Sequence, residues 1–256
     1  MDENPSPPVG IHPICHHRTQ QAAYLTWLRA NNGVPYDGSD SQNRSASGQC
    51  HKSPPHRSPR MSVPKTMFQL SGRGYAAANL NHATLVIIDA QKEYLSGPLA
   101  LSGMDAAVAN IQQLVAAARN AGRPIVHVRH LGTVGGLFDP QGERGEFIRG
   151  LEPLGDETII GKLLPSAFHG TGLEKHLQDL GSLDLIVCGF MSHSSVSTTV
   201  RAAKNLGFRC TLVEDACATR DLPYKGGILS AEHVQQTEMA IMADNFATLA
   251  STKDLI

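Results

Sequence analysis

The sequence has almost no net charge, and it lacks a membrane-length apolar run and an even set of cysteines. Its 22 Lys and Arg residues nearly balance 23 Asp and Glu residues, so the overall charge favours neither nucleic acid nor an anionic membrane as a partner. No apolar stretch approaches the length of a membrane span, and the N-terminus lacks the charged-then-apolar layout of a secretion signal. The five cysteines have no disulfide-framework spacing, which favours a reduced, cytoplasmic protein.

Residues 1–66 differ in composition from the rest of the chain. They hold nine of the 15 prolines and five of the 12 histidines, with many Ser, Asn and Gln residues. Such a segment buries too little apolar surface to offset the entropy cost of ordering it, so we expect a disordered extension. Its pairs at Cys15-His16 and Cys50-His51 lack the ligand spacing of a structural zinc site. Residues 67–80 would then lead into one domain at 81–256.

From about residue 81 the chain alternates apolar strand patterns with helical patterns. Strands are expected at 84–88, 124–129, 158–160, 183–188, 209–213 and 247–249. Helices are expected at 105–121, 173–180 and 231–244, with a further helix that starts at Ser194 and Ser195. Connections at 131–156 and 221–228 read as loops. This alternation predicts an α/β protein with a six-stranded, mostly parallel sheet.

Polar side chains follow four of the expected strands. Asp89 and Gln91 come after the first strand, His130 after the second, Lys162 after the third, and Ser195 in the turn after the fourth. In the strand order 3-2-1-4-5-6, strands one and four are neighbours at the point where the order reverses, which is where ligands bind. Asp89 and Ser195 would face each other there, with Lys162 beside them. A carboxylate, an ammonium and a nucleophile in one cleft suit acyl transfer.

Each of these residues also has a plainer interpretation. Asp89 could form a turn after its strand, and Ser194 and Ser195 could be helix N-caps. Spacing alone leaves the cap and the nucleophile both open. His130 and His193 have no carboxylate or histidine at ligand spacing, so we expect them to line a substrate site or to form structural hydrogen bonds, and we expect no metal.

Five motifs, in order, resemble the isochorismatase-like cysteine hydrolase superfamily over residues 81–255. They lie at 86–91, at 161–162 with 166–171, at 187–193, at 197–203 with 207–208, and at 214–219. The resemblance implies a Rossmann-like three-layer αβα sandwich, with the strand order given above. It also implies a homo-oligomer that hydrolyses amides and related C–N bonds of small polar substrates, without a cofactor.

The resemblance further implies a role for each matching residue. Asp89 would deprotonate the nucleophile, and Lys162 would lower the pKa of the nucleophile and stabilise charge. The family's nucleophilic cysteine aligns with Ser195. A cis peptide bond is implied between Phe190 and Met191, and the N–H groups of Met191 and Ser195 would form the oxyanion hole. The residues expected to bind substrate are Gln91, His130, Phe168 and His193.

Serine at position 195 departs from the family's pattern. An alcohol is far less acidic than a thiol, so an Asp–Lys pair suited to a thiol is expected to activate Ser195 poorly. Three explanations stay open. The chain is an engineered Cys→Ser variant, or a natural member with altered chemistry such as vinyl-ether cleavage with Asp89 as general acid, or a member that only binds ligand. The motif at 189–193 resembles the cysteine-hydrolase branch, which places C–N hydrolysis first.

Overall fold

The computed structural model describes residues 63–256. The expected extension therefore lies outside the described residues, except for 63–66. The segment at 67–80 carries a short helix, α2 (Met67–Ser71), which begins at a capping box formed by Thr66 and Gln69. The Tyr75 hydroxyl then accepts the N–H of Cys210, which fastens this segment to the sheet.

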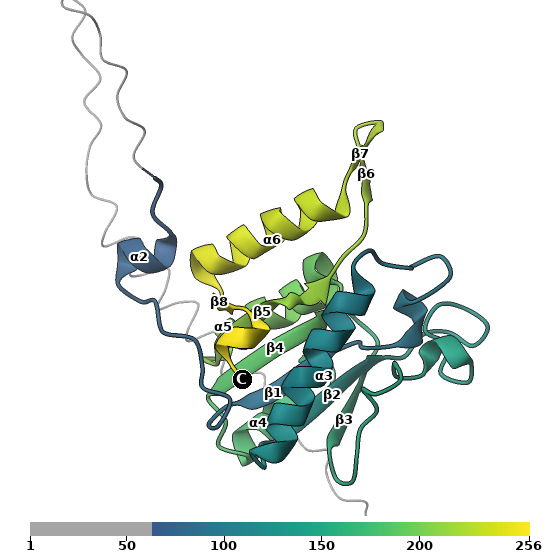
Figure 1. Cartoon of the computed structure of the whole chain (residues 1–256), viewed down its shortest axis with the longest axis horizontal. Coiled ribbons are helices and arrows are strands. Elements are labelled where there is room, and N and C mark those ends of the chain that lie inside the picture. Colours follow the sequence, from purple (N-terminus) through teal and green to yellow (C-terminus); the bar gives the residue numbers. More distant parts are fainter. Residues whose placement is uncertain (1–62) are drawn as a thin grey trace, which may run out of the picture. The chain divides into compact units, whose positions relative to one another are not determined.

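The central sheet has six strands in the order β3-β2-β1-β4-β5-β8, and each neighbouring pair is parallel. The strands are β1 (Thr84–Ile88), β2 (Ile125–His130), β3 (Thr158–Lys162), β4 (Asp184–Phe190), β5 (Arg209–Ala218) and β8 (Thr248–Ala250). The predicted order 3-2-1-4-5-6 is confirmed, with β8 as the sixth strand (Figure 1). The two central strands, β1 and β4, are apolar because helices cover both of their faces.

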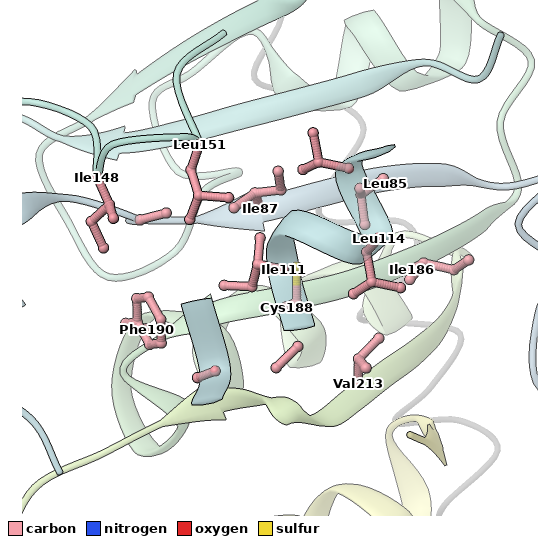
Figure 2. Packing of buried hydrophobic residues seen from close by; sticks show 14 of the residues in the cluster. Leu85, Ile87, Ile111, Leu114, Ile148, Leu151, Ile186, Cys188, Phe190 and Val213 are labelled. Carbon is pink, nitrogen blue, oxygen red and sulfur yellow. The ribbon is translucent and has the colours of Figure 1, made fainter. Parts of the chain in front are cut away.

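Helices cover both faces of the sheet, as the three-layer prediction requires. One face packs against α3 (Met104–Asn120), and the other packs against α4 (Leu173–Asp179), α5 (Ser197–Asn205) and α6 (Ala231–Asn245). In Figure 2, Ile111 and Leu114 of α3 point toward Leu85, Ile186 and Cys188 on the strands. These side chains are almost completely buried, so the apolar stripe of α3 fixes that helix over the centre of the sheet.

The segment expected as a loop at 221–228 is in fact a hairpin of β6 (Leu222–Tyr224) and β7 (Gly227–Leu229). Lys225 and Gly226 form its turn with φ angles of 48° and 77°, which suits a two-residue hairpin connection. The hairpin projects beyond the end of α6 (Figure 1). Within residues 63–256, no helix is both long enough and apolar enough to span a bilayer.

The long connection from β2 to β3 is held to the domain by a buried carboxylate. Glu93, in the short helix η1 (Lys92–Tyr94), accepts the N–H of Phe138 at 2.8 Å and pairs with Arg144 at 3.1 Å. Arg144 lies in the second short helix, η2 (Glu143–Gly145). The ring of Phe138 then packs against His130 at 5.0 Å between centroids, so the connection closes over the end of β2.

Candidate active site

The carboxyl ends of β1, β3 and β4 bring the candidate catalytic residues together. Asp89 follows the last residue of β1, and its N–H donates to Val128 of β2 at 2.9 Å. Lys162 is the last residue of β3 and stands in register with His130 of β2. Ser195 lies in the turn after β4. Each residue therefore reaches the same edge of the sheet from a different strand.

Gly189 allows β4 to approach β1 beside this edge. Its φ is 116°, a region that side chains disfavour, and a Cβ at this position would lie 2.1 Å from the carbonyl oxygen of Ile88. A glycine is therefore required next to the strand end that carries Asp89.

Lys162 connects the predicted triad. Its Nζ lies 2.7 Å from Asp89 Oδ2, donates to Ser195 Oγ at 3.1 Å, and lies 3.4 Å from His130 Nδ1. Lys162 and Asp89 are each 1% exposed and Ser195 is 6% exposed. An ammonium has three N–H donors, and three polar neighbours lie within 3.4 Å of this one.

Burial changes the acidity of the groups around Lys162. Desolvation raises the pKa of Asp89 from 3.8 to about 6, against the opposing effects of the Lys162 charge and of hydrogen bonds from Lys162 and Ser195. Desolvation, together with the Lys162 charge, lowers the pKa of His130. His130 is therefore neutral near pH 7, and its Nδ1 can accept from Lys162.

The nucleophile candidate lies in a π-helical turn, η3 (Ser192–Val196), which continues into α5. The interpretation of Ser194 and Ser195 as N-caps is wrong, because the helical turn already begins at Ser192 and both serines lie inside it. The turn is anchored from α6, since the Ser192 hydroxyl donates to Gln235 at 2.6 Å. The peptide bond between Phe190 and Met191, just before the turn, is cis.

The expected substrate-binding residues fall into different environments. The Gln91 side chain is fully buried and engages three backbone groups, two at His130 and one at Gly145, so it braces the end of β2. His193 is half-buried and hydrogen-bonds through Nδ1 to the Thr219 hydroxyl. Phe168 stacks on Phe208 at 5.8 Å, within the apolar cluster under α4 and α5. Of the four, His130 is the one that contacts Lys162.

The sequence patterns did not predict the cluster of aromatic side chains, Tyr94, Phe138 and Phe190, that lies beside the triad. Tyr94 is 2% exposed, and its ring meets Phe138 at 5.2 Å and Phe190 at 5.8 Å between centroids. Desolvation, followed by the Asp89 charge, raises the pKa of Tyr94, so its hydroxyl stays protonated. Tyr94 lies three residues after the motif at 86–91, and this closeness in the sequence could have indicated that it lies near the site. Nothing in the sequence indicates this for Phe138, because its position depends on the fold of the long connection.

No described cysteine is placed to act as the nucleophile in place of Ser195. Cys188, Cys210 and Cys217 are free and buried. Burial raises the pKa of Cys210 and of Cys217 to about 12 and that of Cys188 well above the ordinary value. These thiols stay protonated at neutral pH and therefore lack the reactive thiolate form.

Two cavities of about 520 Å³ lie away from the triad. One opens at the amino ends of β2 and β3, and the other lies beside Arg129 under the long connection. Neither is lined by Asp89, Lys162 or Ser195. Over residues 63–256, no group of three or more His, Cys, Asp and Glu side chains is arranged to hold a metal ion.

A parallel Rossmann-like sheet with a buried Asp, Lys and Ser at its carboxyl edge defines the class as an α/β protein with a hydrolase-type site. The Isochorismatase domain model matches residues 83–254. The chain belongs to the isochorismatase family of hydrolases.

Proteins of known structure and known sequence support this assignment. The crystal structure of an isochorismatase from Pseudomonas putida KT2440 is 68% identical, with a TM-score of 0.75, over 76% of this chain and 100% of that one. A secreted isochorismatase effector of Verticillium dahliae is 36% identical over 181 residues, which is 70% of this chain and 93% of the effector. A streptothricin hydrolase of Streptomyces noursei is 32% identical over 166 residues, which is 65% of this chain and 58% of that enzyme.

Proposed function

We propose that the protein hydrolyses an amide, imide or ureide-type C–N bond of a small polar substrate, with Ser195 as the nucleophile. The observation that carries this proposal is the buried Lys162 ammonium, which contacts Asp89 at 2.7 Å and Ser195 at 3.1 Å. The likeness to streptothricin hydrolase, a protein named for a hydrolysis, supports the same type of reaction.

In the proposed reaction, Ser195 Oγ forms a bond to the substrate carbonyl carbon while its proton passes to Asp89. Lys162 stabilises the negative charge that develops on Oγ, and the N–H groups of Met191 and Ser195 stabilise the carbonyl oxygen. The C–N bond then breaks as Asp89 returns the proton to the leaving nitrogen. Water hydrolyses the acyl ester in a second step, with Asp89 again accepting and returning a proton.

The surroundings of Asp89 favour its work as a base toward an alcohol. A carboxylate with a pKa of about 6 accepts a proton more readily than one with the ordinary value of 3.8. The hydrogen bond from Lys162 to Oγ also favours the ionised form of Ser195. Together these two effects reduce the difference in acidity between the hydroxyl and its base.

The test is to assay a panel of amides, imides and ureides with the wild-type protein, Ser195→Ala, Asp89→Asn and Ser195→Cys. Loss of the nucleophile or of the base is expected to lower kcat/KM by about 100-fold or more. Ser194→Ala is the matched control, because it removes a hydroxyl from the same turn and is expected to retain activity. Full activity of Ser195→Ala contradicts the proposal, and activity in Ser195→Cys alone identifies a disabled site.

A second candidate is vinyl-ether hydrolysis of the isochorismatase type, with Asp89 as general acid. The observation that favours it is the raised pKa of Asp89, because about half of these carboxyls are protonated near pH 6. This reaction needs no nucleophile. Turnover of isochorismate by wild type and by Ser195→Ala, abolished in Asp89→Asn, would establish it in place of the first. Binding without turnover in every form would instead indicate a ligand-binding member of the family.

The proposal also covers the setting of the reaction. We expect a cytoplasmic homo-oligomer whose partner is a small molecule, with no cofactor and no nucleic-acid or membrane partner. The free thiols of the described cysteines agree with a reducing compartment. Because the relative from Verticillium dahliae is named as secreted, cell fractionation with an antibody is the direct check. Recovery in the culture medium would contradict this part of the proposal.

A further inference from the structure

A cavity of about 520 Å³ lies under the long connection, on the side of β2 that carries Arg129. Its lining is mostly charged and consists of Lys92, Arg129, Glu146, Phe147, Arg149 and Glu152. The backbone around it is well fixed, since Gln91 and Phe147 form an isolated β-bridge and the N–H of Ile148 donates to Ala90 at 2.9 Å. The cavity is therefore bounded by ordered backbone rather than by a free loop.

The carboxylates in this lining already have partners. Glu146 lies 2.7 Å from Lys92 Nζ, and Glu143 lies 3.4 Å from the same atom, so the Lys92 charge is balanced. Glu152 accepts the N–H of Gly150 at 2.6 Å. That backbone contact leaves the negative charge of Glu152 in place, so the lining holds charges of both signs. Among the described residues, Arg129 and Arg149 are the two cations of the lining that have no carboxylate partner.

Arg129 is the unusual member of the lining. It is half-buried, its Nε is buried without a hydrogen-bond partner, and its guanidinium forms no ion pair with any residue in 63–256. Four other arginines do pair with carboxylates, namely Arg119, Arg144, Arg201 and Arg209. Arg220 Nε also lacks a partner, but Arg129 in addition lines this cavity. A buried donor without an acceptor is unfavourable, so an acceptor that entered the cavity and reached this guanidinium would stabilise it.

We propose that this cavity binds a small anion through a phosphate or carboxylate group. The Arg129 guanidinium presents a planar set of donors that matches two anionic oxygens, and Arg149 supplies a second charge from the rim. Arg149 is exposed and, among the described residues, has no ion-pair partner, so both arginines are available. The ring of Phe147 forms the apolar wall of the site.

This anion site is distinct from the catalytic cluster. Arg129 and His130 are consecutive residues of β2, so their side chains leave opposite faces of the sheet. His130 contacts Lys162 on one face, whereas Arg129 lines the cavity on the other. The proposed anion therefore binds behind the strand end that supports the triad.

The test follows the Arg129 Nε–H signal by NMR while inorganic phosphate or succinate is added at constant ionic strength. The signal is assigned by its loss in Arg129→Gln. Saturable movement of this signal is expected with at least one anion, and which anion saturates it distinguishes a phosphate-bearing from a carboxylate-bearing ligand. Constant ionic strength removes the general screening effect of added salt.

Two variants keep the result decisive. Arg149→Gln changes an exposed residue, so it leaves folding intact, and it is expected to weaken the affinity by about tenfold, as the loss of one charge-assisted contact does. Lys175→Gln removes the same charge from an exposed position outside the cavity and is expected to leave the affinity unchanged. Linear, unsaturated movement with both anions, or equal weakening by Arg149→Gln and Lys175→Gln, would overturn the proposal.

Discussion

Lys162 is the residue around which the chemistry of the site is arranged. Its side chain is among the largest that are fully buried, and its three neighbours are a carboxylate, a hydroxyl and a neutral imidazole. A buried ammonium is stable only when such partners compensate for its lost hydration. The same contacts hold Asp89 and Ser195 next to each other. The interactions that stabilise the buried Lys162 charge therefore also fix the geometry of the site.

The pH dependence of kcat/KM distinguishes the two roles proposed for Asp89. Because burial raises its pKa to about 6, amide hydrolysis with Asp89 as base is expected to rise as the pH increases through about 6. Vinyl-ether hydrolysis with Asp89 as acid is expected to fall over the same interval. Initial rates measured between pH 4.5 and 8.5 show whether kcat/KM rises or falls with pH. His130→Gln is the control, because the pKa of His130 is lowered and its titration could also change the rate over the same pH interval. A pH dependence that remains in His130→Gln does not come from His130.

For single residues, the sequence predicts which side chains come together at the site better than it predicts their burial and contacts. Asp89, Lys162 and Ser195 could be placed together because each follows a strand of known order, and parallel strands end at one edge. The burial of Gln91 and the stacking of Phe168 on Phe208 could not be predicted, because both depend on packing between distant segments. The lack of a partner for Arg129 is likewise visible in three dimensions alone.

At the scale of elements, the apolar strands and the amphipathic helix α3 were predicted closely, and the turns were not. The first strand matches the prediction, whereas β5 continues past 213 to Ala218 through a shift in its pairing with β4. The π-helical turn at Ser192–Val196 has no sequence pattern of its own. Its Ser192 hydroxyl donates to Gln235 of α6, a contact between distant segments that the local sequence does not predict.

Glu157 joins α3 and β2 to the connection that precedes β3, and its removal is expected to destabilise the domain. It accepts from Arg119 of α3 at 2.7 Å and contacts His127 of β2 at 2.9 Å, and it also accepts the N–H of Leu154. Glu157→Gln is expected to lower the free energy of unfolding at pH 7 by about 1–3 kcal/mol, measured by urea denaturation. Asp179→Asn, which breaks an exposed pair with Lys175, is expected to cost about 0.5 kcal/mol or less.

The effect of Glu157→Gln also depends on pH. Hydrogen bonds from Arg119 are the largest cause that lowers the pKa of Glu157, from 4.5 to about 2. Because the folded pKa lies below the unfolded one, the stabilisation is present above about pH 4.5 and is lost as the pH falls toward 2. The difference between wild type and variant should therefore narrow in acid. A difference that widens there would contradict this role.

At the scale of the whole molecule, large apolar side chains remain exposed near the site and on the hairpin. Leu163, next to Lys162, is 71% exposed, and Ile228 of β7 is 76% exposed. Leu164 is exposed beside Leu163, and Tyr224 and Leu229 are exposed on the same hairpin as Ile228. Contiguous exposed apolar patches mark surfaces that contact another protein. Sedimentation equilibrium is expected to give a multiple of 27.4 kDa, and Leu163→Glu and Ile228→Asp are expected to shift the distribution toward the monomer. A monomer at micromolar concentration would refute the homo-oligomer.

The order of the strands has a consequence for the way the candidate site is assembled. Asp89 and Ser195 are far apart in the chain, yet they follow strands that are neighbours in the sheet, and β2 and β3 are made between them. Contacts of such long sequence separation form slowly, after loops of matching length have closed. During synthesis, Asp89 and Ser195 can come together only after β4 and the turn that follows it have left the ribosome. The first appearance of turnover would thus report that the centre of the sheet has closed.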